Sequence, residues 1–442
     1  MRNFLKEIEN KILIYDGSKG YLLQKLGLQG GECGELWNIT NRDAVRDVYR
    51  LYKEAGSDII QTNTFPGNRI HLDKYSLGDR TYEINFQGAR LAREIAGDDT
   101  LVAASIGPVG LLFEPSGELT FDKAYEVFSE QVKAVTDGGV DIINFETFTD
   151  VAEMRAALLA AKENSNLPVI CSMAYEAGGR TLMGNDPFIA VSVLLSLGAD
   201  VIGTNCSFGA GHMLEIVKKM YDAGGGYLCV KPNAGLPEVV DGKACYNETA
   251  ESFAEQTAEF VKYGAGIVGG CCGTTPEYIR AIKDKISKME PVSVQKRKTG
   301  IITSGVKHFP VAALATGSIG KLDALSDKEL LEHLNKADMI FVEDRALDIS
   351  TEGFDAVFID IDAAGGDDLL LSGTINVVQS YVKEPLIIKT SNPAALEKAL
   401  RIYKGIAGVI VDETAGQNRD SLLRLAKKYG SEIVTNVTGI LS

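Results

Sequence analysis

Short apolar runs alternate with helix-like segments through the first two thirds of the chain. Each run is rich in β-branched residues and ends in Gly, Asn, Cys or an acidic residue, which is typical of a buried strand. These runs predict eight strands, at residues 11–17, 57–65, 100–107, 140–148, 168–176, 200–207, 226–234 and 265–273. The segments with a helical period predict eight helices, at residues 41–55, 79–96, 121–138, 150–164, 186–197, 212–223, 247–262 and 276–289.

Eight strands alternating with eight helices is the count of a closed parallel barrel, the (βα)8 TIM barrel. An open, doubly wound sheet has the same alternation and is the alternative. The formal GxGxxG match from Gly264 to Gly269 leads into a strand, whereas a dinucleotide-binding turn leaves one. We therefore expect an α/β protein with a TIM barrel over residues 1–290 and no dinucleotide site.

A polar stretch at residues 291–300 breaks this rhythm and predicts a linker. Residues 301–442 then resume an α/β pattern, but this region is too short for a second complete barrel of ~250 residues. It is either a half barrel or a small sheet sandwiched by helices. We expect strands at 312–316, 338–343, 356–362, 386–389, 408–412 and 432–437, and helices at 327–336, 368–383, 393–403 and 419–429.

The formal net charge of −15 opposes non-specific binding to nucleic acid and to anionic membranes. The basic run Lys296-Arg297-Lys298 is expected to be a solvated part of the linker. The first ten residues lack the apolar centre of a signal peptide, and no apolar run is long enough to span a bilayer. We expect a cytoplasmic protein whose seven cysteines are free thiols or metal ligands.

The predicted barrel strands end in polar residues. Function in a TIM barrel gathers at the carboxyl ends of the strands, so these side chains should converge on one mouth. The strand ends are Asp16-Gly17, Thr62-Asn63-Thr64, Glu146-Thr147, Asn205-Cys206, Pro232-Asn233 and Cys271-Cys272.

Cysteines are the most specific signal among these strand ends. Cys271 and Cys272 are adjacent within a run of glycines, which frees the backbone to turn both sulfurs toward one ion. Cys206 ends the predicted strand that comes two strands earlier in the barrel. Soft sulfur ligands favour zinc, and three ligands leave the open position of a catalytic zinc site. A substrate thiol would fit that position and lose its proton there.

Two alternatives compete with the metal site. Free cysteines are often buried core residues, which is our interpretation of Cys33, Cys171, Cys229 and Cys245. A redox dithiol is the other alternative, although adjacent cysteines lack the CxxC spacing.

Three further strand-end residues are candidate substrate contacts. Glu146 follows an apolar run and would accept the ammonium group of an amino acid, or else form a salt bridge with a Lys or Arg at the rim. Asp16 would contact substrate or cap the next helix. Asn233 would contact substrate or satisfy loop backbone.

The strand-end motifs resemble the homocysteine S-methyltransferase family, in particular the homocysteine-binding domain of cobalamin-dependent methionine synthase, over roughly residues 1 to 290. The resemblance implies a (βα)8 barrel, zinc bound by Cys206, Cys271 and Cys272, and substrate contacts from Asp16, Gly17, Ser18, Glu146 and Asn233. It rests on Thr62-Asn63-Thr64-Phe65, Ser105-Ile106-Gly107-Pro108, Glu146-Thr147-Phe148-Thr149-Asp150, Gly203-Thr204-Asn205-Cys206, Pro232-Asn233-Ala234-Gly235-Leu236-Pro237 and Gly269-Gly270-Cys271-Cys272-Gly273-Thr274.

Two features depart from the family pattern. Lys19 follows Asp16-Gly17-Ser18 where the family commonly has a small or apolar residue, so a different thiol acceptor is an alternative. These 442 residues also hold no DxHxxG cobalamin signature. The second region resembles a pterin-binding barrel only through the segment from Thr390 to Glu397.

The expected function is zinc-dependent methyl transfer to homocysteine, giving methionine, with methylcobalamin on a separate corrinoid protein as donor. Direct methylation from S-methylmethionine or betaine is the alternative within enzymes. A non-catalytic thiol-binding or zinc-binding component of a methyl-transfer complex is the alternative from another class.

Overall fold

The computed structural model describes residues 3–114, 116–240, 243–246, 248–294 and 299–435. The basic run 296–298, residue Asn247 and the end of the last expected strand lie outside the described residues. The chain divides into two compact units, Met1–Met183 with Ala199–Arg297, and Gly184–Gly198 with Lys298–Ser442. In the described part of the chain, none of the helices is both long enough and apolar enough to pass through a membrane.

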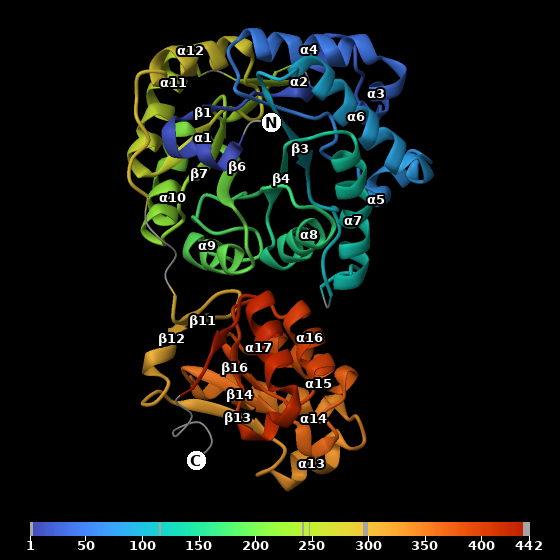
Figure 1. The fold of residues 1–442 in the computed structure, drawn as a ribbon, viewed down its shortest axis with the longest axis vertical. Coiled ribbons are helices and arrows are strands. Elements are labelled where there is room, and N and C mark those ends of the chain that lie inside the picture. Colours follow the sequence, from blue (N-terminus) through green and yellow to red (C-terminus); the bar gives the residue numbers. More distant parts are fainter. Residues whose placement is uncertain (1–2, 115, 241–242, 247, 295–298, 436–442) are drawn as a thin grey trace. The chain divides into compact units, whose positions relative to one another are not determined.

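An eight-stranded parallel sheet forms the centre of the first unit (Figure 1). The strands follow the order β1-β10-β7-β6-β5-β4-β3-β2, and a bridge between Tyr15 and Ile59 joins the two ends of this series. The TIM barrel expected from the sequence is therefore confirmed. The barrel strands are β1 (Leu13–Ile14), β2 (Ile59–Gln61), β3 (Leu101–Ile106), β4 (Ile142–Phe148), β5 (Val169–Met173), β6 (Val201–Gly209), β7 (Leu228–Asn233) and β10 (Ala265–Val268).

Helices connect these strands, and side-chain caps begin several of them. Asp186 accepts a hydrogen bond from the Ile189 amide at 2.9 Å, directly before Pro187, as the sequence predicts. The helices of this unit are α1 (Phe4–Asn10), α2 (Lys19–Lys25), α3 (Trp37–Thr40), α4 (Arg42–Glu54), α5 (Arg69–Asp73), α6 (Thr81–Ala96), α7 (Phe121–Asp137), α8 (Val151–Asn164), α10 (Ala210–Asp222), α11 (Ala250–Glu259) and α12 (Pro276–Ile286). The helix α9 (Pro187–Ser196) follows β5 in the chain and belongs to the second unit.

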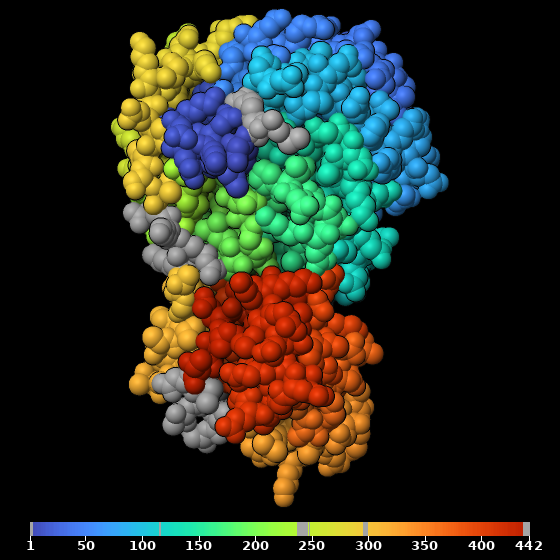
Figure 2. Space-filling model, viewed as in Figure 1, coloured from blue at the N-terminus to red at the C-terminus, as the bar shows by residue number. Residues whose placement is uncertain are grey.

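The amino-terminal end of the barrel is covered by α1, which the sequence pattern did not predict (Figure 2). Phe4 and Ile8 of this helix pack against the first residues of the strands, including Leu13 and Ile59. Seven residues capped by Asn3 are too few to show a clear helical period. The fold therefore closes this end of the barrel with a short helix.

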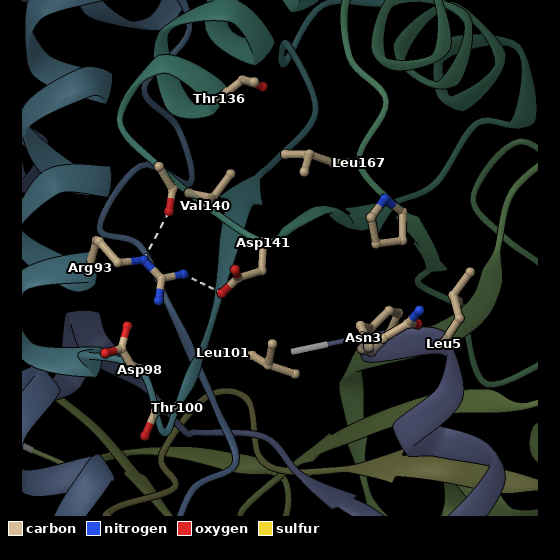
Figure 3. A pocket seen from close by; sticks show the side chains of 13 residues that line it. Asn3, Leu5, Arg93, Asp98, Thr100, Leu101, Thr136, Val140, Asp141 and Leu167 are labelled. Atoms are coloured by element: carbon tan, nitrogen blue, oxygen red, sulfur yellow. Dashed lines mark hydrogen bonds and ion pairs between the residues drawn. The ribbon is translucent and has the colours of Figure 1, made fainter. Parts of the chain in front are cut away.

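A cavity of about 850 Å³ lies beside α1 at the same end of the barrel (Figure 3). Arg93 spans one side, where it pairs with Asp141 and donates a hydrogen bond to the Gly139 carbonyl at 3.0 Å. The cavity is lined by residues that precede β3 and β4, so it lies opposite the carboxyl ends where the polar residues gather.

An additional antiparallel hairpin, β8 (Pro237–Val240) and β9 (Lys243–Tyr246), follows β7. The sequence pattern predicted a stiff turn at this point but not the hairpin.

The second unit contains a five-stranded parallel sheet in the order β13-β14-β15-β16-β17. Consecutive neighbours in this sheet are parallel, and right-handed crossovers, the general rule for such pairs, would place the connecting helices on one face. The opposite face packs against the hairpin β11–β12 through residues such as Ile302 and Phe309. The elements are β11 (Ile301–Thr303), β12 (His308–Pro310), β13 (Ile319–Asp323), α13 (Lys328–Leu334), α14 (Met339–Glu352), β14 (Ala356–Asp360), α15 (Asp368–Tyr381), β15 (Leu386–Lys389), α16 (Pro393–Ile402), β16 (Gly408–Ile410), α17 (Arg419–Lys428) and β17 (Glu432–Ile433).

Two strand predictions in this unit were wrong. Residues 338–343 form the start of α14, because the Asp338 carboxylate accepts hydrogen bonds from the Ile340 and Phe341 amides as a helix cap. Its buried side chains, Val342, Ala346 and Ile349, recur at helical spacing. Residues 312–316 form a 3-10 turn and its exit instead of a strand.

Candidate functional site

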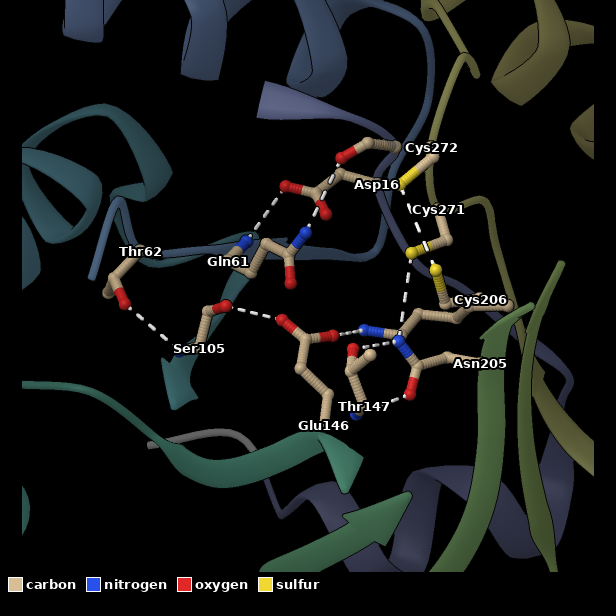
Figure 4. Close-up of polar contacts among 12 residues, drawn as sticks. Asp16, Gln61, Thr62, Ser105, Glu146, Thr147, Asn205, Cys206, Cys271 and Cys272 are labelled. Atoms are coloured by element: carbon tan, nitrogen blue, oxygen red, sulfur yellow. Dashed lines mark hydrogen bonds and ion pairs between the residues drawn. The ribbon is translucent and has the colours of Figure 1, made fainter. Parts of the chain in front are cut away.

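Three sulfur atoms meet at the carboxyl end of the barrel (Figure 4). Cys206 lies near the end of β6, and Cys271 with Cys272 follows β10. Their sulfur atoms all lie within 4.8 Å of one another, and the Sγ atoms of Cys206 and Cys272 are 3.9 Å apart without a disulfide. Tetrahedral zinc with Zn–S bonds of ~2.3 Å separates two sulfurs by about 3.8 Å. The donor set and its spacing therefore fit a zinc ion.

Unusual backbone conformations turn these sulfurs inward. Cys206 and Ser207 have φ values of 63° and 61°, in the left-handed region that non-glycine residues rarely adopt. Gly273 has a φ of 78°, and a Cβ at Gly270 would lie 2.2 Å from the Thr274 hydroxyl. The glycines predicted to loosen this segment are thus required by local crowding and by a left-handed turn.

Neighbouring amides hold the cysteine segment in place. The Cys271 amide donates to the Pro232 carbonyl at 2.8 Å, and the Cys272 amide donates to Asn233 Oδ1 at 3.1 Å. Asn205 Nδ2 approaches Cys271 Sγ at 3.6 Å and donates to the Thr147 hydroxyl at 2.8 Å. Asn233, a candidate substrate contact, therefore supports the Cys272 backbone in this structure.

The three cysteine thiols have different pKa values, so they do not ionise equally. Hydrogen bonds from the Cys271 and Cys272 thiols lower the pKa of Cys206 to about 3. Contact with the Cys206 thiolate raises the pKa of Cys271 to about 11, and contacts with Cys206 and Cys271 also raise the pKa of Cys272. One negative charge is therefore favoured among three protein sulfurs, and a cation is needed for all three to ionise together.

Glu146 lies in the mouth and forms a buried ion pair with Lys231 of β7 (Figure 4). Its other carboxylate oxygen accepts a hydrogen bond from Ser105 Oγ of β3. The Lys231 ammonium also stacks over the Tyr15 ring, 4.1 Å from its centroid. Burial lowers the pKa of Lys231, but the Glu146 carboxylate and nearby thiols outweigh this effect and leave that pKa raised. Glu146 thus forms a salt bridge with a buried lysine and not with a residue at the rim, and its contact with a substrate stays a prediction.

Asp16 and the residues after it line the mouth on the β1 side. Asp16 is fully buried, and its Oδ2 accepts a hydrogen bond from the Gln61 amide at 2.8 Å, while Oδ1 has no partner within the described chain. Burial raises the pKa of Asp16 to about 7, against the opposing effect of Lys19. The cap of α2 is Ser18, whose Oγ accepts from the Tyr21 amide, so the idea that Asp16 caps this helix was wrong. A Cβ at Gly17 would lie 2.7 Å from the Thr274 hydroxyl.

Three other cysteines of the described chain lie outside this cluster. Cys33, Cys171 and Cys229 are buried, as expected of core thiols, whereas the side chain of Cys245 lies outside the description. Lys231 was not predicted as a site residue, although a single lysine between Val230 and Pro232 on a buried strand is an available signal.

Comparisons with known proteins identify the barrel. A family model described as homocysteine S-methyltransferase matches residues 13–286. A methionine synthase of Mycobacterium leprae (strain TN) is 30% identical over 314 residues, which cover 66% of this chain and 26% of that protein. A methionine synthase of Mycobacterium tuberculosis (strain ATCC 25618 / H37Rv) is 27% identical over 460 residues, which cover 98% of this chain and 38% of that protein. The chain therefore spans well under half the length of these curated relatives.

Solved structures support the same fold. The homocysteine methyltransferase MmuM from Escherichia coli, in its metallated form, matches with a TM-score of 0.53 and 20% identity, covering 62% of this chain and 96% of that one. Its apo form matches with a TM-score of 0.50 and 19% identity, covering 64% and 98%. Since the family model covers most of the barrel and the barrel mouth carries the cysteine cluster, the chain belongs to the homocysteine S-methyltransferase family of methyltransferases.

Proposed function

We propose that this protein binds zinc through Cys206, Cys271 and Cys272 and methylates the thiol of homocysteine, giving methionine. The observation that carries the proposal is the meeting of three sulfurs, all within 4.8 Å of one another, in the mouth of a barrel of this family. Zinc bound there supplies Lewis acidity that favours loss of the thiol proton at neutral pH.

The chain's own residues orient the acceptor. The unpartnered Oδ1 of Asp16 and the carboxylate of Glu146 present negative charge to the ammonium group of the amino acid. Gly17 and Ser18 line the same side of the mouth, and Asn233 holds the Cys272 backbone. In the reaction the acceptor sulfur gives up its proton and forms a bond to the methyl carbon as the bond from that carbon to the donor breaks.

The methyl donor is methylcobalamin carried by a separate corrinoid protein. Support comes from the methionine synthase relatives and from an apolar rim around the mouth. Leucines on the loops after β3, β5 and β7 are between 42% and 66% exposed, an unusual exposure for large apolar side chains that suits a protein partner. These leucines are Leu111, Leu112, Leu182 and Leu236.

Elemental analysis and turnover test this proposal together. Purified protein is expected to hold about one zinc per chain and to form methionine from homocysteine with a methylcobalamin-loaded corrinoid protein. Cys272→Ser should lose both metal and turnover, while the matched control Cys33→Ser, at a buried cysteine away from the cluster, should keep them. Parallel assays with S-methylmethionine and betaine identify a corrinoid-independent donor. A zinc-loaded protein that is inert with every donor would contradict methyl transfer, and protein without zinc would contradict the metal site.

A further inference from the structure

Lys19 is a largely buried lysine in the barrel mouth. It begins α2, directly after Asp16-Gly17-Ser18, and is 7% exposed. Among the residues that the structure describes, none forms a hydrogen bond or an ion pair with its ammonium group. The charged groups that act on it are those of the site, Asp16, Glu146, Lys231 and Cys271, and it also acts on the buried Glu35.

A buried ammonium without a counter-ion is unfavourable. Burial lowers the pKa of Lys19, and the carboxylates of Asp16 and Glu146 oppose this effect. The other lysine of the mouth, Lys231, differs because it is paired directly with Glu146. Lys19 thus keeps an unsatisfied positive charge where a substrate enters, which is typical of a group that meets its counter-ion in the ligand.

An unsatisfied negative group accompanies this cation. Asp16 Oδ1 is buried and has no hydrogen-bond partner within the described chain, although Oδ2 of the same carboxylate is occupied by the Gln61 amide. One free acceptor and one unpaired cation, which act on each other electrostatically, therefore lie in the same mouth. A ligand that carries an ammonium and a carboxylate on one carbon would satisfy both, whereas an amine without a carboxylate would leave Lys19 unpaired.

We propose that Lys19 binds the carboxylate of the acceptor and so makes this site selective for thiols that carry an α-amino acid group. The inference rests on the proposed function, since it assumes that a thiol is the substrate of the cysteine cluster. Lys19 is a binding residue in this role, and the side chain that departs from the family pattern becomes a determinant of specificity.

Thiol binding to the cobalt(II)-substituted protein tests the inference without turnover. The visible spectrum of cobalt bound by cysteines reports the arrival of another sulfur ligand. Homocysteine is compared with 3-aminopropane-1-thiol, which keeps the thiol and the amine but lacks the carboxylate. Wild type should bind homocysteine about 10- to 100-fold more tightly than the decarboxylated thiol, as expected for a hydrogen-bonded charge pair.

Three variants complete the design. Lys19→Met should weaken homocysteine binding by about 10- to 100-fold and leave the affinity for 3-aminopropane-1-thiol within about threefold. Lys19→Arg should keep most of the preference because it keeps the charge. Lys25→Met removes the same charge from the exposed end of α2 and should change neither affinity. Thermal melting checks folding, and Lys19→Met should melt no lower than wild type because it removes an unpaired buried charge.

The outcomes separate the two proposals. If wild type binds both thiols with equal affinity, or if Lys19→Met weakens both to the same extent, the role of Lys19 is overturned while thiol binding stands. If neither thiol changes the cobalt spectrum of wild type, the proposed function fails, and the role of Lys19 falls with it.

Discussion

The buried pair of Glu146 and Lys231 offers the sharpest test of how this barrel holds charge in its mouth. The two side chains are only 6% and 1% exposed, respectively. Ser105 donates a hydrogen bond to Glu146, and the Tyr15 ring lies against the Lys231 ammonium. Neither partner can recover solvation if the other is removed, because strands β3, β4 and β7 surround them.

The expected cost follows from this burial. Removing one partner of a buried ion pair destabilises a protein by about 3–5 kcal/mol, because it leaves an uncompensated charge. We expect Glu146→Gln and Lys231→Met each to lower the free energy of unfolding of the barrel by about this amount. The double variant carries neither charge, so its cost should be at least about 2 kcal/mol smaller than the sum of the single costs.

The assay is urea unfolding followed by tryptophan fluorescence. The chain has one tryptophan, Trp37 in α3, so its emission reports the barrel rather than the second unit. If the slope of the unfolding free energy against urea concentration is unchanged and only the midpoint concentration shifts, the substitution has changed stability alone. Single variants within about 0.5 kcal/mol of wild type, or costs that simply add in the double variant, would refute the reasoning.

Three other predictions concern pH, backbone and metal. Burial raises the pKa of Glu153 to about 8, so the folded state binds the extra proton and stability is lost as pH rises from about 4.5 to 8. In urea titrations, the free energy of unfolding of Glu153→Gln relative to that of wild type should therefore rise by roughly 2–4 kcal/mol between pH 5 and pH 8. Gly273→Ala should cost more than about 2 kcal/mol and weaken zinc binding, because its Cβ would lie 2.4 Å from the Tyr246 ring at a positive φ. Its control, Gly226→Ala, has a positive φ in open space and should cost only about 1 kcal/mol, and equal costs would contradict the crowding argument. Zinc binding should release about two protons, because the raised pKa values of Cys271 and Cys272 keep these two thiols protonated before the metal binds. Calorimetry in two buffers measures this number, and a release of no protons would contradict a site of three thiolates.

Local patterns in the sequence determined the barrel and the cysteine cluster. Strand and helix periodicity is a property of neighbouring residues, so all eight barrel strands were predictable, and parallel strands bring their carboxyl ends to one mouth. That rule by itself predicts that Cys206 lies near Cys271 and Cys272, and the glycines around the pair leave the backbone free to turn. Where the pattern was short or ambiguous, as at α1 and at the apolar run that opens α14, the prediction failed.

Only the tertiary structure decided how the charges are arranged. Glu146 and Lys231 are 85 residues apart in the chain, and nothing local in either segment indicates that the two strands place them in contact. The burial of Lys19 and the free oxygen of Asp16 likewise depend on how several βα units close around one mouth. Periodicity encodes which face of an element is buried, whereas ion pairs and unpaired charges arise from contacts between distant segments, and these follow from packing.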